Sequence, residues 1–277
     1  MDSYPNPSSR RFLVESYEQS DSQYRRASLL WMAGIALLLV PLATLVDIQT
    51  SRWFMDDPFP GEILDTLDMS LIYAHTSGIF LILLCIGLLA PKARWHIPRL
   101  ATLAMGAGAV ATLVKMFILR PRPNSMNLDL ATYDYAWIWS FDLTLSNVTL
   151  FDASTRAFPS AYLATATAFT VGLWVVVPRA RWIFVALCVC TMAQRLYCGA
   201  HFTSDLFGSA SIGLAWAFVC YHPSMLGRIF DKMADEDKGP RRRFESDEDV
   251  AEPCSEELED LDAEESQEVP VPHRRAA

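Results

Sequence analysis

The sequence predicts an all-α fold of six membrane-crossing helices with polar segments at both ends. Hydrophobic residues make up 52% of the 277 residues, although the C-terminal segment is strongly charged. The apolar residues gather in six runs, each close to the length that a helix needs to cross about 30 Å of hydrocarbon. These runs cover roughly residues 27–46, 70–90, 100–119, 160–177, 182–200 and 205–222. The expected membrane domain is therefore 27–222.

The net charge of −9 is concentrated at the C-terminus and says little about the membrane domain. From Asp231 onward there are 17 acidic and 7 basic residues, so the rest of the chain carries about one positive charge. Acidic segments with few aromatic residues do not bury enough apolar surface to fold. We expect 223–277 to be a disordered cytoplasmic tail, and 1–26 to be a polar, mobile or interfacial cytoplasmic segment.

Basic residues predict which side of the membrane each connection occupies. They accumulate at the N-terminus, after the second and fourth runs and after the sixth, whereas the other side has four Arg residues, Arg52, Arg120, Arg122 and Arg156. Positive charge marks the cytoplasmic side of a membrane protein. We therefore expect a multi-pass protein, in a bacterial inner membrane, with both termini cytoplasmic.

The stretch from Gln194 to Asp205 carries three ionisable residues at the edge of apolar runs. Arg195, His201 and Asp205 have the spacing R-x5-H-x3-D. Ionisable groups at membrane depth are costly and are usually functional. If the chain is helical from His201 onward, Asp205 lies one turn away on the same face and could orient the imidazole as a base or nucleophile. The alternative is a buried ion pair that only ties helices together.

Two further stretches give this triplet a context. Lys115 and Arg122 have the spacing K-x6-R-P, and residues 158–162 read Phe-Pro-Ser-Ala-Tyr. In this order, the three motifs resemble those of the type 2 phosphatidic acid phosphatase and vanadium haloperoxidase superfamily, in its membrane lipid phosphatase branch. Gly199 and Gly208 also resemble the third motif. The sequence departs from the family at Tyr162, where the family has its general-acid His, and at Gln194, where Ser is usual.

The predicted topology brings all three motifs to the non-cytoplasmic ends of the helices. Lys115, Arg122 and Arg195 would supply cationic donors to the non-bridging oxygens of a phosphate group. Ser160 would add donors at a helix N-terminus.

The resemblance assigns roles to the remaining residues. It implies that His201 is the nucleophile that forms a phosphohistidine and that Asp205 orients it. It also implies metal-independent chemistry with no cofactor, because three cations replace the metal. The six Cys residues form no C-x2-C pair or zinc-like cluster and are expected to be ordinary membrane-core residues.

The protonation of the leaving group stays open. Tyr162 occupies the catalytic position of the family's His, but a phenol with a pKa of about 10 matches neutral pH less well than an imidazole. A diphosphate substrate would need little protonation, and His75 could replace the missing imidazole, although a helix-packing role for His75 is favoured. Alternatively, the protein binds lipid phosphates without hydrolysing them.

The expected function is that of an integral-membrane lipid phosphate or diphosphate phosphatase with an outward-facing site. Its partners would be the bilayer and a lipid phosphate or polyprenyl diphosphate, with no nucleic acid. A catalytically impaired lipid-phosphate-binding protein of the same superfamily is the alternative. A transporter is less favoured because no internal repeat is visible.

Overall fold

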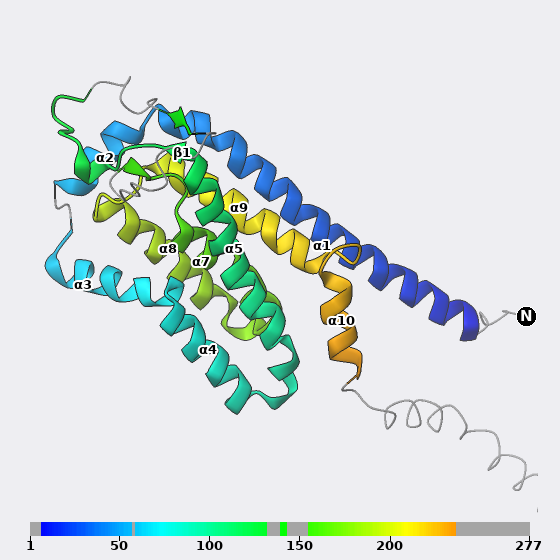
Figure 1. Ribbon diagram of the computed structural model, residues 1–277. Coiled ribbons are helices and arrows are strands. Elements are labelled where there is room, and N and C mark those ends of the chain that lie inside the picture. The colour runs from blue at the N-terminus through cyan, green and yellow to red at the C-terminus, as the bar shows by residue number, and fades with distance from the viewer. Residues whose placement is uncertain (1–6, 57–58, 132–138, 143–154, 237–277) are drawn as a thin grey trace, which may run out of the picture. The chain divides into compact units, whose positions relative to one another are not determined.

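The computed structural model describes residues 7–56, 59–131, 139–142 and 155–236, of which 7–25, 92 and 234–236 are described by their backbone alone. This part of the chain is predominantly helical (Figure 1). The helices are α1 (Pro7–Thr44), α2 (Asp47–Met55), α3 (Gly61–Ser70), α4 (Thr76–Leu89), α5 (Ile97–Phe117), α7 (Ala161–Val176), α8 (Arg181–Tyr197), α9 (Thr203–Tyr221) and α10 (Gly227–Glu236). Two short strands, β1 (Ile118–Leu119) and β2 (Ser140–Phe141), pair antiparallel.

Each of the six predicted apolar runs contains a helix, but the count of six crossings stays a prediction. Within the described residues, 26–44 and 93–117 are long and apolar enough to cross a membrane, and the bent pair of 61–74 and 76–89 could form a third span. Helices α7 and α8 are shorter, with 16 and 17 residues. Helix α9 has 19 residues, and the polar residues of its first turns lower its mean hydropathy. These apolar helices are those of an integral membrane protein.

The run predicted as one helix over 70–90 is broken at His75, which corrects the sequence-based prediction. The helix pair that precedes and follows His75 bends by 68°. His75 has an extended backbone, and its ring Nδ1 accepts a hydrogen bond from Ser77 N–H at 3.3 Å, so the side chain starts α4 anew. A Cβ at Gly78 would lie 2.0 Å from the Ile72 carbonyl oxygen, so glycine allows the close approach at this bend.

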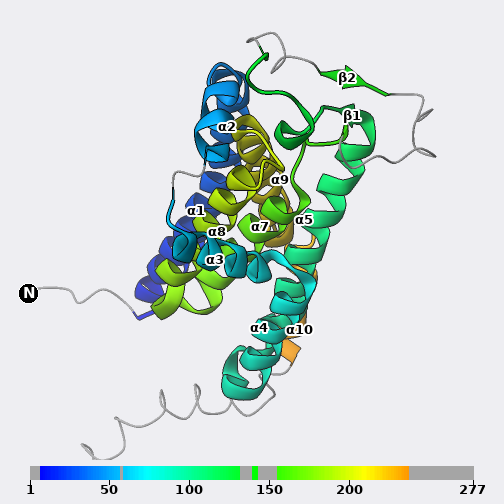
Figure 2. The same ribbon diagram turned by 90° about the vertical axis from the view of Figure 1, so that its left-hand side faces the viewer.

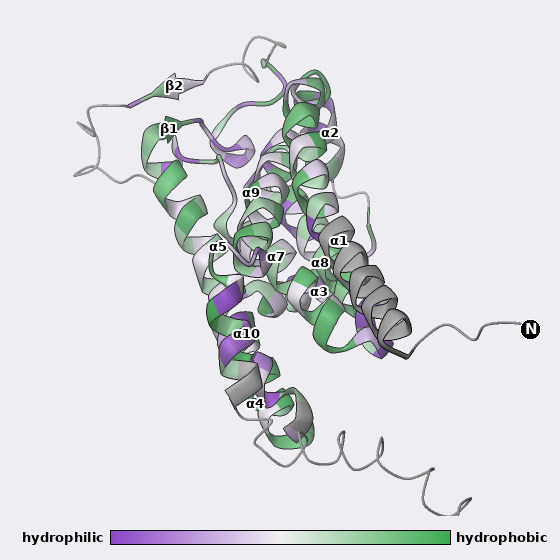
Figure 3. Ribbon diagram, turned by 90° about the vertical axis from the view of Figure 1, so that its right-hand side faces the viewer, coloured by the Kyte–Doolittle hydropathy of each residue, from purple (hydrophilic) through white to green (hydrophobic). Residues whose placement is uncertain are grey.

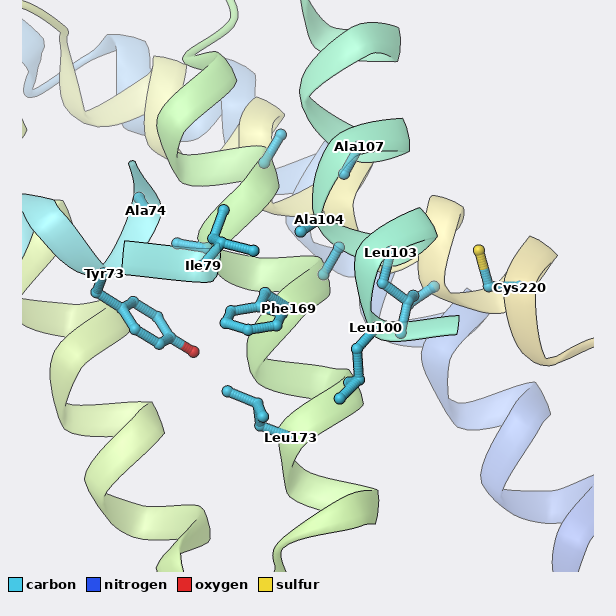
Figure 4. Close-up of a cluster of buried hydrophobic side chains, with 14 of the residues drawn as sticks. Tyr73, Ala74, Ile79, Leu100, Leu103, Ala104, Ala107, Phe169, Leu173 and Cys220 are labelled. Carbon is cyan, nitrogen blue, oxygen red and sulfur yellow. The ribbon is translucent and has the colours of Figure 1, made fainter. Parts of the chain in front are cut away.

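The core lies between helices that carry many small residues. Helix α1 packs along α9, and α5, α7 and α9 pack against one another (Figures 1 and 2). Figure 4 shows the buried cluster, in which Leu100, Leu103 and Ala107 of α5 lie near Phe169 of α7. Small residues let membrane helices approach closely, and the resulting packing stabilises the bundle where lipid supplies no hydrophobic force between helices.

The outer faces of the membrane helices are apolar. Figure 3 shows hydrophobic residues along most of α5, in contrast to polar residues on α10. Leu38 and Leu89 expose 72% and 82% of their surface, and other large apolar side chains of α1 and α4 are similarly open. In water such faces would mark an interaction surface. In an integral membrane protein, such faces are expected to contact lipid.

Both ends of the described chain contain more helix than the sequence predicted. Helix α1 begins at Pro7, well before the apolar run, because no Gly or further Pro interrupts 8–26 and an existing helix extends at little cost. In the predicted tail, α10 begins at Gly227. Arg99 holds its beginning, pairing with Asp231 at 2.5 Å and donating to the Gly227 carbonyl oxygen at 3.3 Å.

Candidate active site

The three sequence motifs meet at one end of the bundle. This end contains the C-terminal turns of α5 and α8, the N-terminal turns of α7 and α9, and helix α2 (Figures 1 and 2). Lys115 lies in the last turn of α5 and Arg195 in the last turn of α8. Ser160 is the residue before α7, and Asp205 belongs to the first turn of α9. Helix ends thus bring together residues that are up to 90 positions apart in the sequence.

The loop that carries Arg122 is attached to the turn that carries His201. Asn124 N–H donates to the Gly199 carbonyl oxygen at 3.0 Å, and the Asn124 side chain donates to the Cys198 carbonyl oxygen at 3.4 Å. Gly199 has φ of +62°, and a Cβ there would lie 3.0 Å from the Cβ of Asn124. Only glycine accepts both the conformation and the approach without strain.

Asp205 is fully buried and firmly held. Its Oδ2 accepts a hydrogen bond from Phe202 N–H at 2.8 Å, which caps the start of α9, and its Oδ1 forms an ion pair with Arg120. His201 Nδ1 lies 3.9 Å from the same Oδ2, which is too long for a hydrogen bond. The sequence suggested that His201 lies one helical turn from Asp205 on a shared face, provided that the helix starts at His201. Helix α9 instead begins at Thr203, so His201 precedes the helix.

A second carboxylate, Asp47 of α2, completes this charge network. Its Oδ2 pairs with Arg120 Nη2 at 2.7 Å, and its Oδ1 accepts from Ser204 N–H at 2.9 Å. The Ser204 hydroxyl donates to Asp47 and also accepts from Arg120 Nη1 at 2.8 Å. The Arg120 guanidinium lies 4.4 Å from the ring centre of Phe202 and 4.5 Å from that of Trp139. All three charged groups are at most 1% exposed, and their mutual pairing is what makes this burial tolerable.

His201 is 3% exposed, and its Nδ1 has no hydrogen-bond partner among the described residues. Burial lowers the pKa of His201 well below its ordinary value, and the positive charges of Lys115, Arg195 and Arg122 lower it further. A hydrogen bond with the Ala157 backbone acts in the opposite direction. The imidazole is therefore neutral near pH 7, which is the form that can act as a nucleophile or base.

The polar atoms around His201 include several that lack partners. In the described part of the chain, Arg122 Nε and Ser160 Oγ are buried without a hydrogen bond, and Lys115 forms no ion pair. Ser160 N–H donates to Ser209 Oγ at 2.7 Å, which in turn donates to the Asp205 carbonyl oxygen at 2.5 Å. The start of α7 is thereby fixed while the Ser160 hydroxyl stays available. Arg99 Nε and Tyr221 Oη, at the other end of the bundle, are also buried without a hydrogen bond to any described residue, so the distinguishing feature here is that three cations, Lys115, Arg122 and Arg195, lie close enough to His201 to affect its charge.

Arg195 contacts the two residues at which the sequence departs from the family motifs. Its Nε donates to Gln194 Oε1 at 2.9 Å, and its guanidinium carbon lies 4.9 Å from the ring centre of Tyr162. Gln194 Nε2 donates to Asp68 Oδ1 of α3 at 2.9 Å. The His75 ring is roughly parallel to that of Tyr162, with 6.4 Å between their centres. His75 thus lies beside the site, as well as starting α4.

Sequence reasoning missed Asp47, Arg120 and Asp68. Arg120 lies two residues before Arg122 in the same R-P-R-P stretch, and the sequence does not indicate which of the two is paired. Asp47 directly follows the first apolar run, so an acidic residue at the edge of a span was its only signal. Among the described residues, no group of three His, Cys, Asp or Glu side chains could hold a metal ion, and their five Cys are free.

A family model provides the first comparison with known proteins. Residues 98–225 match the PAP2 superfamily. The PAP2 match covers just under half of the chain and contains every motif residue from Lys115 to Asp205, but neither Asp47, Asp68 nor His75. It confirms the superfamily resemblance over these residues, whereas the lipid phosphatase branch stays a prediction.

Whole-protein comparisons add little to the PAP2 match. No functionally curated protein matches the sequence. Among solved structures, a transmembrane PAP2-type phosphatidylglycerolphosphate phosphatase from Bacillus subtilis is similar, with 18% sequence identity and a TM-score of 0.49. The similarity covers 76% of this chain and 96% of that one.

Proposed function

We propose that this protein is an integral-membrane lipid phosphate or diphosphate phosphatase that acts through a phosphohistidine intermediate. The observation that carries the proposal is the group of buried donors without partners around a neutral, buried His201. A neutral imidazole beside cations is suited to attack a phosphoryl group, because the cations stabilise the negative charge that develops on the phosphoryl oxygens. The PAP2 match supports a phosphatase at the level of the superfamily.

The proposed reaction has two steps. In the first, a ring nitrogen of His201 attacks phosphorus, and the bond from phosphorus to the lipid or diphosphate oxygen breaks with its electron pair on the leaving oxygen. In the second, water attacks the phosphohistidine, inorganic phosphate leaves, and the imidazole is restored. Asp205 orients the ring, which requires His201 Nδ1 to approach Oδ2 by about 1 Å from its present 3.9 Å to form a hydrogen bond.

Lys115, Arg122 and Arg195 would hold the non-bridging oxygens, and the Ser160 hydroxyl would donate a further hydrogen bond. Arginine suits this role because its planar fork matches two phosphate oxygens at once. Such donors are worth more in a water-poor site than in bulk water. Three protein cations supply the positive charge for the transition state, so we propose turnover without a metal.

The proposed substrate preference follows from position 162. No imidazole stands there to protonate an alkoxide, which is a poor leaving group, and positioned general acids typically contribute about 10²- to 10⁴-fold. A phosphate leaving from a diphosphate needs much less protonation. We therefore favour polyprenyl or other lipid diphosphates over lipid monoesters.

The proposed orientation places the site on the outer face, with both termini in the cytoplasm. It rests on the asymmetry of Lys and Arg between connections. Leu130 is 77% exposed and lies in the connection that follows Arg122. In an otherwise Cys-free protein, Leu130→Cys should react with a thiol reagent that cannot cross the membrane and is added outside the cells. Reaction only after membrane permeabilisation would reverse the orientation.

The function is tested by phosphate release from matched monoester and diphosphate lipids by purified full-length protein in detergent. We expect release in the presence of a chelator, inhibition by vanadate, a preference for the diphosphates, and no release by His201→Ala. A requirement for Mg²⁺, or activity in His201→Ala, would contradict the proposed chemistry.

A lipid-phosphate-binding protein without turnover is the second candidate. It is favoured by Tyr162, whose ring, rather than an imidazole, lies against Arg195. Vanadate binding by the wild-type protein without phosphate release from any of the lipids would support this candidate.

A further inference from the structure

Arg195 differs from the other two cations of the site because contacts from two elements fix it. Its Nε is hydrogen-bonded to Gln194 Oε1 at 2.9 Å, and its guanidinium lies over the Tyr162 ring, 4.9 Å from the centre. In the described part of the chain, neither Lys115 nor Arg122 has a side-chain hydrogen bond or a ring contact of this kind. Arg195 is thus pre-oriented before any ligand binds.

The Gln194 contact is unusual for neighbouring residues of a helix. Side chains at i and i+1 do not face each other on a helix, so this bond requires both side chains to turn toward one another. Gln194 is only 5% exposed, and its amide nitrogen donates to Asp68 Oδ1 of α3 at 2.9 Å. The amide can accept from arginine and donate to a carboxylate at the same time, which neither Glu nor Ala can do.

The Tyr162 contact uses the ring face. A guanidinium over an aromatic face within about 6 Å is attracted by the ring quadrupole. No described residue forms a hydrogen bond with the Tyr162 hydroxyl. The face of the ring, which Phe would share, is therefore the part of Tyr162 that contacts the site.

We propose that Tyr162 and Gln194, with Asp68 behind Gln194, are positioning residues that hold Arg195 with its two Nη atoms presented to the phosphoryl group. The proposal deepens the proposed function, on which it rests. Because Nε is occupied by Gln194, the two Nη atoms form the edge left for two oxygens of one tetrahedral oxyanion. Tyr162 thereby acts on the reaction through Arg195, and both departures from the family motifs serve the same guanidinium.

The experiment measures the dissociation constant of orthovanadate for the purified full-length protein in detergent, together with lipid phosphate release. We expect Gln194→Ala to weaken vanadate binding by about 10-fold, since a hydrogen bond to a charged group is lost. Tyr162→Leu should weaken it by about 3-fold, and Tyr162→Phe should lose much less because the ring face remains. Asp68→Asn should weaken it less than Gln194→Ala.

Trp174→Leu is the matched control. Trp174 lies near the other end of α7, is 37% exposed like Tyr162, and has the Arg181 guanidinium 5.0 Å from its ring centre. The substitution removes the same kind of contact from the same helix far from the site, so vanadate affinity should not change. An equal loss in Trp174→Leu and Tyr162→Leu would mean a general effect on the helix and would overturn the proposal.

A double-mutant cycle separates positioning from a merely structural role. In an Arg195→Ala background, Gln194→Ala and Tyr162→Leu should have no further effect on vanadate affinity. Undiminished effects in that background, or a loss in Tyr162→Phe as large as in Tyr162→Leu, would overturn the proposal. A wild type that releases phosphate but does not bind vanadate would also overturn it while the phosphatase function stands. If the wild type binds vanadate but releases no phosphate, and the double-mutant cycle gives the expected result, the proposed phosphatase activity is wrong while the positioning role is supported.

Discussion

The site has two halves, which differ in whether their charged side chains form ion pairs within the protein. In the paired half, Arg120 forms ion pairs with both Asp47 and Asp205, and Ser204 is hydrogen-bonded to Asp47 and to Arg120. In the open half, Lys115 and Arg122 have no carboxylate partner among the described residues, and Arg195 is held by a neutral amide and a ring. His201 lies between the two halves. It is close to Asp205, and the positive charges of all three cations lower the pKa of its imidazole.

This difference separates scaffold from binding surface more clearly than residue type does. Arg120 and Arg122 are chemically identical and two positions apart, yet only Arg120 already has its counter-charges. Arg120 is buried and needs these counter-charges, whereas Lys115, Arg122 and Arg195 are only partly buried and can also be stabilised by water or by a ligand with negative charge. We therefore expect substitutions in the paired half to affect stability and those in the open half to affect function.

The largest expected effect is that of Arg120→Ala in the paired half. It leaves two carboxylates buried without a counter-charge, and breaking a buried pair in this way typically costs about 3–5 kcal/mol. The free energy of unfolding, from denaturant titration of the purified protein, should fall by this order. Arg122→Ala serves as the matched control and should change it little. Equal stabilities of the two variants would remove the distinction between the halves.

Arg122→Ala should instead lower kcat/KM by about 10²- to 10³-fold, as removal of one donor to a developing oxyanion typically does. Phosphate release from a lipid diphosphate measures this, with the thermal unfolding temperature recorded on the same preparation. A variant that keeps full activity would show that the open half binds no phosphoryl group.

The smallest effect concerns pH. Because the folded protein lowers the pKa of His201, the imidazole stays neutral below pH 6.5, and kcat/KM should fall only at pH values well below that. For the same reason, this residue's contribution to stability is present above about pH 6.5 and is lost as the pH falls, since the unfolded chain binds the proton more readily.

The Lys115→Met variant tests the cause of this shift. It removes one of the charges that lower the pKa of His201, so the acidic limb of the profile of kcat/KM against pH should move to higher pH. Arg94→Met, which removes a positive charge beyond the other end of α5, should leave the acidic limb where it is in the wild type. An acidic limb that does not move in Lys115→Met would exclude the effect of the Lys115 charge on the pKa of His201.

The sequence was sufficient to predict which residues gather at one end of the bundle. The order of the apolar runs and of the basic connections predicted that Lys115, Ser160 and Arg195 lie at one end of the bundle, and the structure has them at the C-terminal ends of α5 and α8 and the N-terminal end of α7. The sequence-based argument assumed that helix direction alternates from one apolar run to the next; the number of membrane crossings and the side of the membrane stay predictions. The motif order then supplied the chemistry, for which the family match gives support at the superfamily level.

The pairing of charges could not be predicted from the sequence. Whether Arg120 or Arg122 faces the carboxylates depends on the short β1–β2 pair and on the bridge between Arg120 and Arg156, which set the path of the loop. The bend at His75 had only Gly78 as a local indication. Gln194 looked like a minor departure because its partner, Asp68, lies 126 positions earlier in the chain.

The contact between Asp47 and Ser204 also bears on how the protein is made. The two residues are 157 positions apart, and Arg120 lies 73 positions after Asp47. During synthesis from the N-terminus, Asp47 therefore waits at the end of the first apolar helix until most of the chain has been inserted. The paired half is complete only once α9 has been made, so the carboxylate of Asp47 gains its hydrogen bonds from Ser204 late in synthesis, after 157 further residues have been added.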